Sequence, residues 1–131
     1  PWMNPVVTRE EVQALEWVES NTPERTVFLT DIFAGELLMG RTLREGTEGG
    51  DWAIVPDVAT KMLEVHNFFL AKDALQARSI AKKYNARFVW VPNRLVFAGF
   101  GWISVEKSKF SQEKFFEKVY AGNGVEIYRV K

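Results

Sequence analysis

Hydrophobic residues near the start of the chain recur at the spacing of one helical face, at Val12, Leu15 and Val18. Thr8, with Glu11 three residues later, has the form of a capping box, in which each side chain accepts a hydrogen bond from the other residue's backbone N–H. Thr22 precedes Pro23, and a proline disfavours the helical conformation of the residue before it. The pattern therefore predicts a helix between Thr8 and Thr22.

Helical spacing returns in three further segments, which begin after Asp31, after Pro56-Asp57 and after Asp73. The last of these is expected to end at Asn85, because asparagine tolerates the left-handed conformation that closes many helices. Phe110 and Phe115 flank Ser111 in the arrangement of a hydrophobic staple around an N-cap. We therefore expect one more helix, which runs to about Tyr120.

Between the helices lie short runs typical of strands, at Val27–Leu29, around Thr42-Leu43, at Phe88–Val91, at Leu95–Ala98 and at Val125–Val130. The continuous runs indicate strands that are buried on both faces. The last run contains polar residues, which suit the edge of a sheet. The alternation of helices and strands predicts one α/β domain over residues 1–131. We expect a small sandwich with a short, mostly parallel sheet flanked by helices and its final strand at an edge.

Composition narrows the classes of function. Lys plus Arg and Asp plus Glu both total 17, and this zero net charge argues against a nucleic-acid partner. The chain has no cysteine, which excludes disulfides, thiolate metal sites and a cysteine nucleophile. No window reaches the ~20 apolar residues of a membrane helix, so we expect these residues to form a soluble domain. Because the chain begins at Pro1 without a methionine, we also expect it to be a fragment of a longer protein.

Motifs of known enzymes are missing: there is no G-x-S-x-G, no P-loop and no H-E-x-x-H. His66 is the only histidine and lies among hydrophobic residues, which favours a structural role over metal binding. A hydrolase would have to be built from carboxylates alone. We therefore predict no catalytic residue, no metal site and no cofactor in this chain.

One candidate ligand site follows from the position of Asp31 at the carboxyl end of a buried strand, where open α/β sheets bind ligands. Arg41, Arg44 and Asp51 lie in or next to the glycine-rich segment that follows and could converge on Asp31. The alternative interpretation is that Asp31 caps a helix while the other charges are solvated. The sequence favours this second interpretation.

A second candidate is an interface at residues 96–103, which contain no charged side chain. Phe97, Phe100 and Trp102 supply its aromatic rings. Most aromatic residues of a small domain belong to its core. If these three are exposed, the segment is a docking surface for another domain or for the membrane interface.

Several segments, taken in their order along the chain, resemble a known family. They are 8–23, Val27 to Asp31, Arg41 with Gly49-Gly50, Ala81 to Val91, and Phe116 to Val130. Together they resemble the extracytoplasmic C-terminal domains of polytopic membrane glycosyltransferases of the oligosaccharyltransferase and mannosyltransferase type, especially archaeal ones. The Trp-Trp-Asp-Tyr-Gly signature of the oligosaccharyltransferases is absent, and Asp51-Trp52 does not replace it.

The resemblance implies a non-catalytic accessory domain, on the extracytoplasmic side of the cell membrane, of a parent glycosyltransferase. Its partners would be the transmembrane portion of the same chain and a lipid-linked sugar or acceptor. The alternative is a small module that binds a nucleotide or sugar at the carboxyl ends of the strands, through Asp31 and Arg41.

Overall fold

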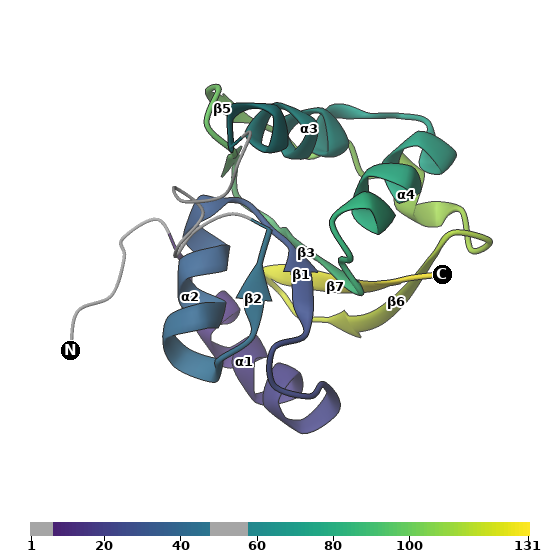
Figure 1. Cartoon of the computed structure of the whole chain (residues 1–131). Helices are drawn as coiled ribbons and strands as arrows, with labels where there is room; N and C mark the ends of the chain where they lie inside the picture. The colour runs from purple at the N-terminus through teal and green to yellow at the C-terminus, as the bar shows by residue number, and fades with distance from the viewer. Residues whose placement is uncertain (1–6, 48–57) are drawn as a thin grey trace.

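The computed structural model describes residues 7–47 and 58–131 (Figure 1). Its helices are α1 (Arg9–Asn21), α2 (Ile32–Thr42), α3 (Val58–Leu70), α4 (Ala74–Lys83) and the short 3₁₀ helix η2 (Ser108–Ser111). Its strands are β1 (Val27–Leu29), β2 (Glu45–Gly46), β3 (Phe88–Pro92), β4 (Val96–Phe97), β5 (Trp102–Ile103), β6 (Phe116–Ala121) and β7 (Val125–Val130). The helix starts predicted at Thr8, Asp31 and Asp73 are confirmed, each by a side chain that accepts a backbone N–H of the first turn.

The predicted α/β class is confirmed, with a five-stranded sheet in the order β2-β1-β3-β7-β6. Strands β2, β1 and β3 are parallel, whereas β7 and β6 run antiparallel to their neighbours, so the sheet is mixed rather than mostly parallel. The final strand, β7, lies inside the sheet and not at its edge. The reason is the tight connection at Gly122–Gly124, which folds β6 back on β7 and leaves β6 as the edge strand.

The helix predicted from Ser111 to Tyr120 is wrong. The chain makes only the single turn η2 and then enters β6, which pairs with β7 along its length. Phe110 does not staple a helix; its ring stacks on Tyr128 of β7, with centroids 4.5 Å apart. Similarly, the strand expected around Thr42-Leu43 is the end of α2, and the strand follows at Glu45–Gly46.

The described residues form two hydrophobic cores, one on each face of the sheet. Helices α1 and α2 cover one face, where Phe28, Trp90 and Ile127 are fully buried. Helices α3 and α4 cover the other face, where Val89 and Val91 of β3 point. Because successive strand residues face opposite sides, covering both faces explains the continuous hydrophobic runs seen in the sequence.

Helices α1 and α2 are parallel neighbours. Strand β1 follows α1 and precedes α2, and it runs opposite to both, so both helices start at the carboxyl end of β1 and end at its amino end. This arrangement brings two helix N-termini together at one end and two C-termini together at the other.

Candidate functional site

Asp31 caps α2 at the carboxyl end of β1. Its Oδ1 accepts the Ala34 backbone N–H at 3.0 Å, which is the N-cap geometry expected from the sequence. Its Oδ2 accepts the backbone N–H of Phe97 at 3.1 Å, across 66 positions of sequence. The side chain is fully buried. One carboxylate thus joins the start of a helix to strand β4.

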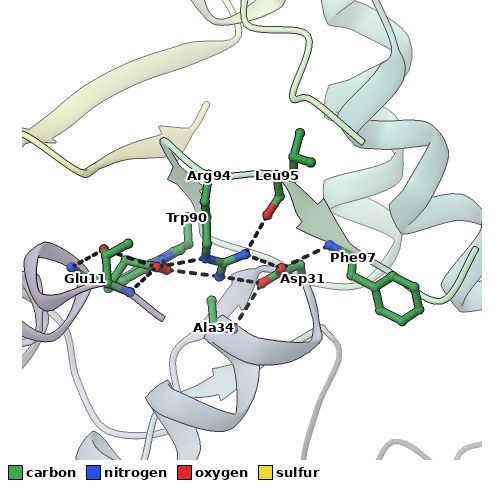
Figure 2. A network of polar contacts seen from close by, with 8 residues as sticks. Glu11, Asp31, Ala34, Trp90, Arg94, Leu95 and Phe97 are labelled. Atoms are coloured by element: carbon green, nitrogen blue, oxygen red, sulfur yellow. Dashed lines mark hydrogen bonds and ion pairs between the residues drawn. The ribbon is translucent and has the colours of Figure 1, made fainter. Parts of the chain in front are cut away.

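Arg94, in the loop after β3, lies between Asp31 and a second carboxylate, Glu11 (Figure 2). Its Nη1 and Nη2 donate to the two Asp31 oxygens at 2.7 and 3.1 Å, and its Nε and Nη2 donate to the two Glu11 oxygens at 2.9 and 3.1 Å. Nη1 also donates to the Leu95 carbonyl at 3.0 Å. All five N–H groups of the guanidinium are therefore used. We call Glu11, Asp31 and Arg94 the polar cluster.

Glu11 is the third residue of α1 and completes the capping box with Thr8, whose backbone N–H it accepts at 3.1 Å. Its other oxygen accepts the indole N–H of Trp90 at 2.9 Å. Both carboxylates of the polar cluster therefore lie at helix N-termini, where the macrodipole favours negative charge. This field offsets the excess of one negative charge that two carboxylates and one guanidinium carry.

Burial and pairing act in opposite directions on Arg94. Burial alone would lower the pKa of its guanidinium, but the hydrogen bonds and charges of Asp31 and Glu11 outweigh burial and raise that pKa. Arg94 therefore stays charged. With every donor used and both carboxylates accepting several bonds, the polar cluster has no capacity left for a substrate. The polar cluster therefore has a structural role: it links α1, α2 and the loop that precedes β4, and we call such a link a joint.

Arg44 lies at the other end of the helix pair and does not approach Asp31. It is buried, and it donates to the carbonyls of Glu19, Thr22 and Thr42 and to the Thr22 hydroxyl. No carboxylate of the described residues lies within ion-pair distance of it. Arg44 therefore caps the C-termini of α1 and α2 at once, where the macrodipoles favour positive charge.

The prediction that Arg44 approaches Asp31 is therefore wrong. The full length of α2 separates the two residues, about 16 Å for 11 residues. Arg41 is exposed in the last turn of the same helix, also far from Asp31. Asp51 lies outside the described residues. Of the three predicted residues that the structure describes, Asp31 alone lies at the carboxyl ends of the strands.

The predicted interface residues form a hairpin of strands β4 and β5, residues 96–103, which we call the aromatic hairpin. The Trp102 ring stacks flat on Phe33 of α2, with centroids 5.6 Å apart and planes 5° apart, and also contacts Phe97. Trp102 remains 48% exposed and Phe100 51% exposed. These rings therefore form a surface that the described part of the molecule leaves half uncovered.

Two observations explain how the aromatic hairpin is held. Gly99 and Gly101 flank Phe100 with φ angles of 112° and 122°, a backbone region that favours glycine. A side chain on Gly99 would also clash with Met62 of α3. At its base, the hairpin is fixed by the bond from Phe97 to Asp31, so the polar cluster sets its position.

His66 lies on α3 with its ring edge against Phe100, 5.7 Å between centroids. The described residues hold no group of three or more histidine, cysteine, aspartate or glutamate side chains that could bind a metal ion. Nor does any helix among them have the length and apolar character needed to cross a membrane.

Sequence reasoning missed Glu11, Trp90 and Arg94 as members of one cluster. One signal was present: Glu11 lies four positions before Leu15 and seven before Val18, on the buried stripe of α1. A carboxylate on a buried stripe requires a cation. No local pattern identified Arg94 as that cation.

No family model matches the sequence, and no curated protein matches it. Among solved structures, the chain is similar to the C-terminal globular domain of an oligosaccharyltransferase from Archaeoglobus fulgidus. The TM-score is 0.70 at 16% sequence identity, over 95% of this chain and 99% of that one. At this identity the comparison establishes the fold: this chain has the fold of an archaeal oligosaccharyltransferase C-terminal globular domain.

Proposed function

We propose that this chain is a non-catalytic accessory domain of a membrane-bound glycosyltransferase that acts on lipid-linked sugars. The observation that carries the proposal is the shared fold, which extends over 95% of this chain and 99% of the oligosaccharyltransferase domain. The order of the resembling segments from Thr8 to Val130 supports it independently. In this proposal the domain lies on the extracytoplasmic side of the cell membrane.

The aromatic hairpin is the surface that we assign to contact with the transmembrane portion of the parent chain. Its exposed rings, Phe100 and Trp102, are uncharged and held in fixed positions by Phe33, Gly99 and Gly101. The polar cluster supports this role, because a rigid joint at the base of the hairpin keeps the contact surface in one orientation relative to the sheet. The domain would thereby help to position the lipid-linked sugar or the acceptor.

The proposal predicts a feature of the gene. The reading frame that encodes this chain should contain several segments of about 20 apolar residues before Pro1. A frame that encodes no such segment contradicts the proposal.

The activity test uses the full-length protein in membranes. Replacing Phe100 and Trp102 by serine should lower transfer from a lipid-linked sugar at least tenfold, because small displacements of bound groups are costly in catalysis. The matched control is Leu75→Ser on α4, which is 53% exposed and lies outside the hairpin. Equal transfer by the hairpin variant and the control, with equal amounts of folded protein, refutes the assigned contact.

The alternative, a module that binds a nucleotide or sugar, is favoured by one observation. A groove of about 340 Å³ lies at the carboxyl end of β3, lined in part by Arg94, Ser104 and Lys107. Grooves in this position are the usual ligand sites of open α/β sheets. Thermal unfolding of the chain with nucleotides and sugars tests this alternative: a rise in Tm that is lost on Lys107→Gln supports it, and no rise at millimolar ligand excludes it.

A further inference from the structure

A second groove, of about 590 Å³, lies at the opposite end of the sheet from the aromatic hairpin. It opens where β1 and β3 begin, between the turn that follows α1 and the turn that follows α4. Its described lining comes from four separate parts of the chain, namely residues 23–27, Lys82, 85–87 and Val130. We call it the amino-end groove.

Three cations line the amino-end groove: Arg25, Lys82 and Arg87. All three are exposed, and no hydrogen bond or ion pair within the described part of the chain uses their side chains. Among the described residues that line the groove, Glu24 is the only acidic one. The described lining of the groove therefore has an excess of two positive charges, in a chain whose net charge is zero.

Helix dipoles account for only one of these cations. Lys82 is in the last turn of α4, where positive charge is favoured. Arg25 and Arg87 lie outside the helices, in the turn before β1 and immediately before β3. The C-termini of α1 and α2 already receive the buried Arg44. Two guanidinium groups in the groove thus neutralise no carboxylate among residues 7–47 and 58–131.

The backbone conformation at Arg25 is unfavourable for arginine. Its φ angle is 68°, in the left-handed region that glycine or asparagine adopts at lower cost. Asn85, on the opposite wall, has a φ of 60° and is a residue suited to that region. The turn at Arg25 therefore does not require arginine, because glycine adopts this φ angle at a lower conformational free energy.

From this geometry we infer that the amino-end groove binds a phosphate group. Guanidinium groups bind phosphate oxygens through paired, charge-assisted hydrogen bonds, and a lysine adds a third donor as a point charge. The groove volume is within the range of small-molecule sites. The phosphate can belong to a soluble small molecule or to a lipid headgroup, and this inference does not depend on the proposed function.

The test is a titration of the ¹⁵N-labelled chain with inorganic phosphate and with pyrophosphate at low ionic strength. We expect amide shifts confined to residues 25–27 and 82–87, with tighter binding of pyrophosphate and a loss of affinity as salt is added. The double variant R25G R87Q should bind at least tenfold more weakly. Because glycine suits the φ of position 25, this variant should fold at least as well at that turn.

The matched control is R9Q K72Q, which removes two exposed cations that do not line the groove. It should retain affinity within twofold. We expect a submillimolar Kd for pyrophosphate. An absence of amide shifts at 20 mM pyrophosphate, at least about twentyfold above such a Kd, overturns the inference. If R9Q K72Q weakens pyrophosphate binding as much as R25G R87Q does, the inference is also overturned, because affinity would then depend only on the net charge of the chain.

The source of the phosphate is distinguished by a second arm with vesicles of phosphatidylcholine, with and without 30% phosphatidylglycerol. Sedimentation with the anionic vesicles that is lost in R25G R87Q assigns the phosphate to a lipid headgroup. Binding of pyrophosphate without such sedimentation assigns it to a soluble ligand. Phe100→Ser, in the hairpin at the opposite end of the sheet, should leave the pyrophosphate titration unchanged, so this test and that of the proposed function fail independently.

Discussion

The two ends of the α1–α2 pair present opposite backbone groups, N–H donors at one end and carbonyl acceptors at the other, and side chains of opposite charge bind them. At the N-terminal end, Glu11 and Asp31 share Arg94, a cation supplied from a loop 63 positions after Asp31. At the C-terminal end, the partners of Arg44 among the described residues are all neutral oxygens at the ends of the two helices. Both ends satisfy the macrodipoles, but only the N-terminal end requires a charge from elsewhere in the fold.

Removal of a single side chain should therefore cost more stability at one end of the helix pair than at the other. Without Arg94, two buried carboxylates would face each other with no cation between them. Without Arg44, the helix carbonyls would lose donors, but no like charges would meet. The comparison therefore predicts a larger loss of stability at the N-terminal end.

The largest effect is expected for Arg94→Met. Removing one partner from a buried ion pair costs about 3–5 kcal/mol, because the remaining charge stays buried and unpaired. Urea unfolding at pH 7 measures the loss. The triple variant E11Q D31N R94M is the control and should recover part of it, since its buried groups carry no charge. A loss below about 1 kcal/mol for Arg94→Met would contradict the assignment of the polar cluster as a buried joint.

Arg44→Met should cost less, about 1–3 kcal/mol, through carbonyls left without donors at the ends of α1 and α2. The same urea unfolding compares it directly with Arg94→Met. Arg41→Met, in an exposed position of α2, is the control and should change stability by less than about 0.5 kcal/mol. If Arg44→Met costs more than Arg94→Met, the comparison of the two helix ends is wrong.

A third helix end, the C-terminus of α3, holds a buried cation that titrates. Lys109 is buried at the C-terminus of α3, where its Nζ donates to the carbonyls of Phe69 and Glu106. Burial lowers its pKa from 10.5 to about 8. Between these values the unfolded chain binds more protons than the folded one, so stability should rise with pH.

The measurement is the free energy of unfolding at pH 8 and at pH 10, with an expected rise of about 1–2 kcal/mol for the unchanged chain. Lys109→Met should abolish the rise. The range stops at pH 10 because burial raises the pKa of Tyr128 in the folded chain. Above that pH the unfolded chain loses the tyrosine proton while the folded chain keeps it, so the free energy of unfolding falls. An identical rise in Lys109→Met would show that another group causes it.

The smallest effect is expected for Thr8→Ala at the start of α1. Thr8 Oγ1 accepts the Glu11 N–H at 3.2 Å, and loss of such an N-cap costs about 1 kcal/mol. The Thr8 backbone N–H still donates to Glu11, so the polar cluster should remain formed. Thr8→Ser, which keeps the hydroxyl, should stay close to the unchanged chain in thermal unfolding. A loss equal to that of Arg94→Met would mean that the capping box, and not the ion pairs, holds this end together.

Several features of the molecule were decided by the sequence alone, because their causes are local. The capping box at Thr8 and Glu11 and the caps at Asp31 and Asp73 involve residues within three positions of each other. The hydrophobic runs at Val27–Leu29 and Phe88–Val91 are local too, and both formed strands. The interpretation of Asp31 as a helix cap rested on the same kind of pattern.

Other features were decided only by tertiary structure. Residues 116–121 became a strand because β7 offered a partner for pairing, which outweighed the local signal for a helix. The pairing of Arg94 with Glu11 could not be predicted from the sequence, because 83 positions separate them and no local pattern indicates which distant segments meet. The same holds for Arg44, because all but one of its acceptors are backbone carbonyls, which every residue has. Local hydrogen bonds set the elements, and long-range packing decided which side chains meet.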